Sequence, residues 1–218
     1  MGKRKKIEDL LAVMPLPQGP WLYTDRMVIA LQTAAVMHAG QYRKGSDVPY
    51  LTHLLGTCAI ALDHGATEDE AIAALLHDAI EDVLPTKDAR KAVRWFGDEV
   101  YAIVLGCTDG VPDKHGKKSE WEARKQAYLD HIADASRSVL LVSASDKLHN
   151  ARSIVADQRA IGHEVFERFS KGKDGTLRYY RSLVTAYRAN PASNPALIDE
   201  LDRVVRKMEK LAGASPSV

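Results

Sequence analysis

The sequence predicts an all-α fold. Apolar residues recur at helical spacing through most of the 218 residues, and no stretch alternates apolar and polar residues as a half-buried strand would. Capping residues and helix breakers divide the chain into segments of helical length. Because no internal repeat or low-complexity tract is present, we expect one helical domain over 23–190, an N-terminal helix and Pro-rich lead-in over 1–22, and a C-terminal helical extension over 191–218 packed on the domain.

Caps and breakers set the expected helix boundaries in the first half of the chain. Thr67 and Glu70 form a capping-box pattern, in which each side chain bonds the backbone N–H of the other. The helix that follows is expected to carry His77 and Asp78 without a break. Earlier in the chain, a polar loop is expected over 40–49. The predicted helices run from Thr24 to about His38, about Leu51 to Asp63, Thr67 to Pro85, Thr86 as a cap to Gly97, and Glu99 to about Cys107.

The second half of the chain continues the helical pattern. Ser119 and Glu122 form a second capping-box pattern. The run 139–142 also suits a short strand by composition, but its apolar pattern continues through Leu148, which favours a helix. A basic loop is expected over 170–175. The predicted helices run from Ser119 to about Ala133, from Ser138 to about Asp157, from Thr176 to Ala189, and onward from the Asn194-Pro195 cap.

Charge and composition argue against several classes of function. Lys and Arg number 30 and Asp and Glu 29, so the net charge of +1 gives no global reason to expect nucleic-acid or membrane-surface binding. No apolar run is long enough to span a membrane. The basic start is followed at once by Glu8 and Asp9, which is typical of a solvated terminus rather than a signal peptide. Cys58 and Cys107 lie in apolar stretches, as buried thiols of a reduced protein do, and we expect a cytoplasmic location.

Four ionisable residues stand in or at the end of one otherwise apolar stretch: His77, Asp78, Glu81 and Asp82. Burying a charge costs several kcal/mol unless it is paired or bound to a metal. On a helix, Glu81 would lie one turn after His77 and Asp82 one turn after Asp78. This pattern favours a metal-ligand pair with two carboxylates one turn further along.

Two further polar residues stand in apolar helical segments. His53 begins one such segment, and Asp146 lies inside another, with Asn150 one turn later. Each residue alone is as well explained by a structural role, but together with His77 and Asp78 they predict a shared cation. Two histidines and two aspartates would leave positions on a six-coordinate ion open, and mixed imidazole and carboxylate ligation suits Mn, Fe, Co or Zn.

The order of these residues resembles the HD superfamily of metal-dependent phosphohydrolases. More narrowly, it is similar to the hydrolase domain of the bacterial Rel/Spo alarmone enzymes and to stand-alone small alarmone hydrolases. The Glu-Asp pair after His-Asp and the Asp-Lys-Leu-His-Asn block are specific to this branch. The segments that carry the resemblance are His38-Ala39-Gly40-Gln41-Tyr42-Arg43-Lys44-Gly45, Pro49-Tyr50-Leu51-Thr52-His53, Ala74-Leu75-Leu76-His77-Asp78-Ala79-Ile80-Glu81-Asp82 and Ser145-Asp146-Lys147-Leu148-His149-Asn150-Ala151-Arg152.

The resemblance implies an enzyme that removes the 3′-pyrophosphate of guanosine tetra- or pentaphosphate. Glu81 and Asp82 would take the proton of the attacking water or position that water. The ion would be Mn²⁺ or another divalent transition metal, held by His53, His77, Asp78 and Asp146. Contacts to the nucleotide are expected from Arg43, Lys44, Lys147, Asn150 and Arg152.

Other interpretations remain open at this point. The same chemistry could act on an adenosine alarmone or a nucleoside monophosphate, because the site would be shared. A non-catalytic nucleotide-binding HD module is disfavoured by the presence of every ligand and acid/base position, and a nucleic-acid binder by the balanced charge. The expected partner is a small-molecule nucleotide, with no membrane. Arg124 and Lys125 are interpreted as a solvated helix face, and Tyr179 and Tyr180 as core packing.

Overall fold

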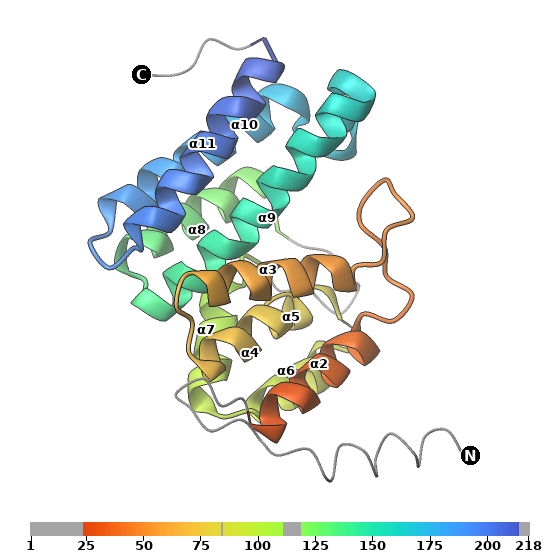
Figure 1. Cartoon of the computed structure of the whole chain (residues 1–218), viewed down its shortest axis with the longest axis vertical. Coiled ribbons are helices and arrows are strands. Elements are labelled where there is room, and N and C mark those ends of the chain that lie inside the picture. Colours follow the sequence, from red (N-terminus) through yellow and green to blue (C-terminus); the bar gives the residue numbers. More distant parts are fainter. Residues whose placement is uncertain (1–23, 84, 111–118, 214–218) are drawn as a thin grey trace.

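The computed structural model describes residues 24–83, 85–110 and 119–213, and it confirms the all-α prediction (Figure 1). Within these ranges the only β-structure is an isolated bridge between Tyr42 and Pro49. The predicted N-terminal helix over 1–22 lies outside the described residues. The elements are α2 (Asp25–Met37), α3 (Leu51–Asp63), α4 (Glu68–Leu76), α5 (Ala79–Asp82), α6 (Thr86–Arg94), α7 (Asp98–Cys107), α8 (Trp121–Asp134), α9 (Arg137–Ile161), the 3₁₀-helix η1 (Gly162–Arg168), α10 (Gly172–Ala189) and α11 (Pro195–Leu211).

The long helix α9 is the centre of the architecture. It packs against α3, α4 and α7 on one side and against α10, α11 and η1 on the other (Figure 1). Leu76, Leu148 and Leu201, from three of these helices, are fully buried in one apolar cluster. The described part of the final helix therefore shares its core with the rest of the domain.

Several predicted caps form as expected. The Thr24 side chain accepts from the backbone N–H of Arg26, and Thr67 and Glu70 make both bonds of the capping box. Asn194 caps α11, whose first residue is Pro195. These bonds satisfy backbone donors that a helix start leaves without an internal partner, which is why these helices begin where the sequence predicts.

The expected unbroken helix through His77 and Asp78 is wrong. The α4 helix ends at Leu76, and α5 begins at Ala79. Between them the backbone forms a turn at His77 and Asp78. The carbonyl of Asp78 accepts hydrogen bonds from the backbone N–H groups of both Glu81 and Asp82. Neighbouring residues on a regular helix point about 100° apart, whereas this turn brings the His77 Nε2 and Asp78 Oδ2 atoms within 3.0 Å.

Three other local predictions are also wrong. Thr86 is the first helical residue and not a cap, because Pro85 takes the cap position. The α8 helix starts after Glu120 without a side-chain cap, so the capping box expected at Ser119 does not form. The predicted loop over 170–175 is partly helical, since α10 begins at Gly172, and the hydroxyl of Thr176 donates to the Gly172 carbonyl at 2.7 Å.

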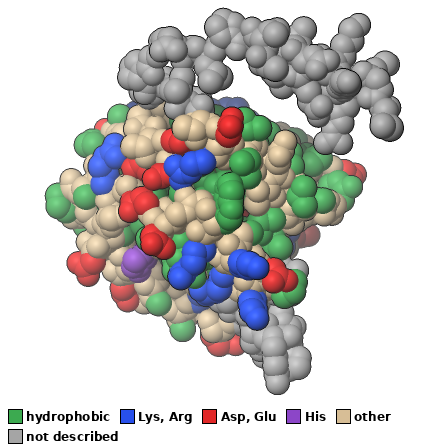
Figure 2. Space-filling view, turned by 90° about the horizontal axis from the view of Figure 1, so that it is seen from below, with side chains coloured by type: hydrophobic (Ala, Val, Ile, Leu, Met, Phe, Trp, Pro, Cys, Tyr) green, Lys and Arg blue, Asp and Glu red, His purple; other side chains and the backbone are tan. Residues whose placement is uncertain are grey.

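The lower face of the molecule is formed in part by α2 and α6 (Figure 1). Acidic, basic and hydrophobic side chains all appear on this face, and several Lys and Arg side chains gather in one part of it (Figure 2). Among all the described residues, Val36 and Trp95 are the most exposed large apolar side chains, at 76% and 63%. Among the described helices, none combines the length and the hydropathy that crossing a bilayer requires.

The close approach of α3 to α9 depends on Gly56. A Cβ at this position would lie 2.1 Å from Cδ2 of His149, and that ring is held by its contact with His53. We expect Gly56→Ala to lower the free energy of unfolding by about 1–3 kcal/mol, the usual cost of overpacking. Urea denaturation followed by circular dichroism measures it.

Helix propensity alone predicts the opposite sign for this variant, since Ala is favoured over Gly by about 1 kcal/mol in a helix interior. Ala59→Gly, at an exposed position of the same helix, is the matched control and should report propensity only. A Gly56→Ala protein more stable than the wild type would contradict the packing argument.

Candidate functional site

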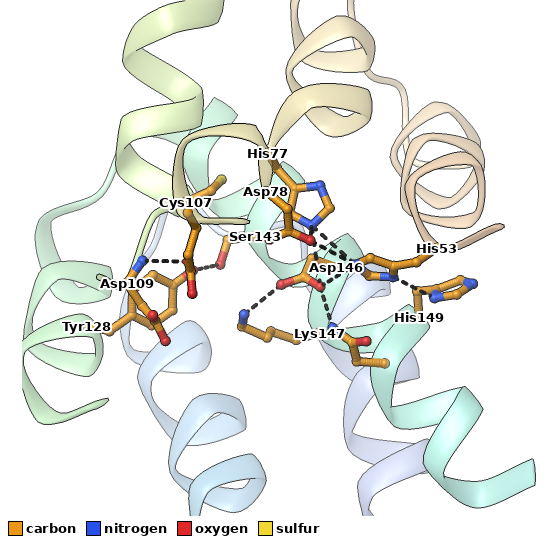
Figure 3. Close-up of polar contacts among 12 residues, drawn as sticks. His53, His77, Asp78, Cys107, Asp109, Tyr128, Ser143, Asp146, Lys147 and His149 are labelled. Atoms are coloured by element: carbon orange, nitrogen blue, oxygen red, sulfur yellow. Dashed lines mark hydrogen bonds and ion pairs between the residues drawn. The ribbon is translucent and has the colours of Figure 1, made fainter. Parts of the chain in front are cut away.

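Four of the predicted site residues converge where three parts of the chain meet (Figure 3). His53 comes from α3, His77 and Asp78 from the turn between α4 and α5, and Asp146 from α9. His53 Nε2 lies 3.3 Å from His77 Nε2 and 3.2 Å from Asp146 Oδ1. Asp78 Oδ2 lies 3.0 Å from His77 Nε2 and 3.4 Å from His53 Nε2. One ligand atom each from His53, His77 and Asp146 lies within 4.8 Å of the other two.

These residues fit a divalent cation. Donors about 2.1 Å from a metal lie about 3.0–3.4 Å from one another, which is close to the spacing found here. The Nδ1–H of His77 donates to the Ala74 carbonyl at 2.8 Å, which leaves the Nε2 lone pair facing the cluster. The Nδ1 atoms of His53 and His149 lie 2.9 Å apart, so His149 can accept from His53 and orient its ring in the same way.

The charges of the cluster are mutually compensated. Burial alone would raise the pKa of Asp146, but Lys147 and the two histidines outweigh it and hold that pKa well below its usual range. Lys147 Nζ donates to Asp146 Oδ2 at 2.6 Å. Burial would lower the pKa of His77, yet Asp78 and Asp146 raise it well above the ordinary value. A proton on His77 and a divalent cation therefore compete for the same carboxylates.

Tyr50 is a site residue that the sequence analysis did not single out. Its hydroxyl donates to Asp78 Oδ2 at 2.6 Å. Burial, together with the nearby Asp78 carboxylate, raises the pKa of Tyr50 far above its ordinary value, so the phenol stays a neutral donor. The family-like segment that ends at His53 contains this tyrosine, but which group it bonds depends on tertiary structure.

Glu81 and Asp82, the predicted catalytic carboxylates, lie one turn beyond Asp78 in α5. Glu81 Oε2 accepts from the backbone N–H of Asp109 at 3.3 Å. Asp82 Oδ2 accepts from the amide Nε2 of Gln41, also at 3.3 Å, and Asp82 lines a pocket. Both carboxylates thus adjoin the cluster of histidines and aspartates without belonging to the group of closest ligand atoms.

The pocket has a volume of about 520 Å³ and is strongly basic. Arg43 donates to Asn150 Oδ1 at 2.8 Å, and Asn150 in turn donates to Asp146 Oδ1 at 2.5 Å. The pocket therefore connects to the ligand cluster through hydrogen bonds. The cationic side chains along its wall are Arg43, Lys44, Arg124, Lys125, Lys147, Arg168 and Lys171.

Arg152 does not lie with the other predicted substrate contacts. It is not one of the residues that line this pocket, and its guanidinium forms an ion pair with Glu200 of α11. The prediction that Arg152 contacts the nucleotide is therefore not supported by its position. Six positions on a helix turn a side chain about 120° away from Asp146, and the ion pair with Glu200 is the surface salt bridge that the sequence allows as an equal alternative for Arg152.

The interpretation of Arg124 and Lys125 as a solvated helix face is wrong. Both line the pocket, and both bind the buried carboxylate of Asp109, Arg124 at 2.5 Å. Lys125 Nζ also lies 4.8 Å from the ring centroid of Tyr179, which is itself at the pocket wall. The basic pair itself is visible in the sequence, but only the fold brings the distant Asp109 carboxylate to it.

The fold and the site together define a helical domain with a candidate divalent-metal centre that opens into a basic pocket. The sequence profile of the HD domain matches residues 30–171, and the chain belongs to this family.

The chain is also similar to several named proteins. The chain is 37% identical over 128 residues to guanosine-3′,5′-bis(diphosphate) 3′-pyrophosphohydrolase MESH1 of Xenopus tropicalis, a match that covers 57% of this chain and 67% of the frog protein. It is 35% identical over 126 residues to a GTP pyrophosphokinase of Streptomyces coelicolor, again over 57% of this chain but only 14% of that much longer protein.

Solved structures show the same fold. A metazoan ortholog of SpoT that hydrolyzes ppGpp superposes with a TM-score of 0.67 at 27% identity, over 88% of this chain and 98% of that one. The protein lmo0812 of Listeria monocytogenes gives a TM-score of 0.61 at 28% identity, over 72% and 99% of the two chains.

The ligand cluster makes a direct prediction about metal retention. His77→Ala should weaken binding of Mn(II) by more than about 100-fold, because even residues behind a ligand change affinity by about 10–100-fold. Helicity should change little. Elemental analysis of the metal that stays bound after gel filtration, with circular dichroism, measures both.

His131, on the exposed face of α8, supplies the matched control, and His131→Ala should retain metal like the wild type. Equal metal content in His77→Ala and His131→Ala would exclude His77 as a ligand.

Proposed function

We propose that this chain is a metal-dependent hydrolase that removes the 3′-pyrophosphate of ppGpp and pppGpp. The observation that carries the proposal is the juxtaposition of a buried His/His/Asp cluster, two adjacent carboxylates and a basic pocket of about 520 Å³. The names of the MESH1 relatives and the activity of the SpoT ortholog support the same reaction. A nucleotide that carries a polyphosphate at both its 3′ and its 5′ position requires a pocket that is both large and cationic.

We propose Mn²⁺ as the native ion, held by His53, His77, Asp78 and Asp146. Mixed imidazole and carboxylate ligation suits Mn, Fe, Co or Zn, and the resemblance to the alarmone hydrolases is the reason for choosing manganese among them. When bound, the ion would polarise a phosphate oxygen and lower the pKa of a coordinated water.

Free buried thiols at Cys58 and Cys107 are compatible with a reducing compartment, and we propose that the protein works in the cytoplasm.

The proton of the attacking water is assigned to Glu81 and Asp82. Both carboxylates are held in place by hydrogen bonds from Asp109 and Gln41, and Asp82 faces the pocket. A general base must lie within hydrogen-bond reach of the proton that it removes, and the place of both carboxylates in α5, directly after Asp78, supports this assignment. The Gln41 amide orients the Asp82 carboxylate, and the Asp109 backbone N–H orients the Glu81 carboxylate, before the substrate enters.

The pyrophosphate would be bound by Arg43, Lys44 and Lys147. Arg43 is held by Asn150, and Lys147 by Asp146, so both cations are oriented before the substrate arrives. Charge-assisted hydrogen bonds from such donors are about twice as strong as neutral ones. Asn150 then acts as the link between the pocket wall and the ligand cluster.

The reaction is tested by incubating the purified chain and Mn(II) with ppGpp, its adenosine counterpart and GMP. We expect release of pyrophosphate from the 3′ position of ppGpp and little phosphate from GMP, as read by ion-exchange chromatography. The double variant Arg43→Ala/Lys44→Ala should raise KM for ppGpp about tenfold or more while changing any monophosphatase activity less.

Rapid cleavage of GMP with ppGpp left intact would replace the proposal by the nucleotidase alternative. Tight binding of ppGpp without turnover would favour a non-catalytic nucleotide-binding module instead.

The assignment of the proton to the two carboxylates generates a further prediction. Glu81→Gln and Asp82→Asn should each keep the bound metal but lower kcat by about 10²-fold, the usual scale for loss of a general base. Steady-state kinetics with metal analysis of the same samples measures both effects. If both variants lost the metal, the two carboxylates would be ligands and not bases.

A further inference from the structure

His38 is a buried residue to which the proposed function gives no role. It stands at the C-terminal end of α2 and is 4% exposed. Its ring stacks on Tyr50, with centroids 5.3 Å apart and an interplanar angle of 19°. Its Nδ1 lies 2.6 Å from Oε1 of Gln41, whose other amide atom reaches Asp82. Two short paths therefore lead from His38 to the site, one through Gln41 to Asp82 and one through Tyr50 to Asp78.

The orientation of the Gln41 amide follows from the chemistry of its partners. An ionised carboxylate is only an acceptor, so the atom of Gln41 that faces Asp82 must be the NH₂ group. The carbonyl Oε1 of Gln41 then faces His38 and can only accept. Nδ1 of His38 must therefore carry the proton.

The surroundings of His38 agree with this tautomer. Its Nε2 is buried and has no hydrogen-bond partner among the described residues. A buried N–H without a partner costs about 1–3 kcal/mol, and the assigned tautomer places a lone pair there in place of a proton. The neutral Nδ1–H form thus provides a donor where Gln41 needs one and leaves no N–H unbonded.

We propose that His38 and Gln41 are positioning residues that orient the Asp82 carboxylate for its work on the attacking water. The proposal rests on the proposed function for the role of Asp82, but not for the direction of the hydrogen bonds. His38 fixes the Gln41 amide, and the amide presents a donor to one carboxylate oxygen. Gln41 also lines the basic pocket, but its role in this assignment is exerted through Asp82 and not through a contact with the substrate.

Kinetics of three variants test the role. Gln41→Leu removes the amide, and His38→Phe keeps the stack on Tyr50 but removes the N–H. His38→Asn is the matched variant, because its side-chain amide can place an N–H near the position of the imidazole Nδ1–H. We expect the first two to lower kcat for ppGpp about tenfold, less than the loss of the base itself, with KM and Mn(II) content within twofold of the wild type. His38→Asn should recover much of the kcat that His38→Phe loses.

The hydrogen-bond direction is tested without substrate. Nitrogen-15 NMR of the wild-type chain labelled at histidine, recorded without Mn(II), distinguishes the two neutral tautomers, and the spectrum of His38→Phe assigns the signal. We expect a protonated Nδ1 and an unprotonated Nε2. If His38→Phe does not fold, the same signal is assigned as the one that shifts in Gln41→Leu, because that variant removes the partner of Nδ1.

The outcomes separate the two proposals. A protonated Nε2 with a bare Nδ1, an unchanged kcat in Gln41→Leu, or equal losses in His38→Phe and His38→Asn would each overturn the positioning role. Absence of ppGpp hydrolysis by the wild-type chain would overturn the proposed function, while the NMR result would still decide the direction of the His38–Gln41 bond.

Discussion

The burial of opposite charges at one point controls the arrangement of the helices. Asp78 and Asp146 are carboxylates within a helical core, and such groups are stable there only when their charge is compensated. The compensation comes from His53, His77 and Lys147, which lie on three different parts of the chain. Helices α3 and α9 and the turn between α4 and α5 must therefore meet at this point. Apolar side chains of these helices pack around the charged cluster and form the hydrophobic core.

Helix α9 distributes its polar side chains in several directions within little more than one turn. Asp146 faces the ligand cluster, Lys147 Nζ lies 5.3 Å from the ring centroid of Tyr128, and His149 contacts His53. Asn150 donates to Asp146 and accepts a hydrogen bond from Arg43 at the wall of the pocket. The metal-ligand cluster and the wall of the pocket are thus built from one segment. The binding of the nucleotide and the positions of the ligands are coupled through it.

Much of this arrangement could be predicted from the sequence, because helix caps and apolar spacing are local. The capping box at Thr67 and the helix from Leu51 to Asp63 formed as predicted. The break after Leu76 could not be predicted, because an apolar run favours a continuous helix. At this break both His77 and Asp78 contact the ligand cluster, and those contacts depend on residues far away in the sequence. Roles that depend on a distant partner were missed for the same reason: Tyr50 needs Asp78, and Lys125 needs Asp109.

The contacts of α9 also restrict which changes of chain length the protein can accept. Loss or gain of one residue between the cap at Ser136 and Asp146 would rotate everything after it by about 100° and shift it by about 1.5 Å. Asp146, Lys147, His149 and Asn150 would then lose their contacts with other elements together. Single substitutions in this stretch remove one contact at a time, but an insertion or deletion removes all of them at once. Variation in length among related chains should therefore accumulate in loops and be absent from this stretch of α9.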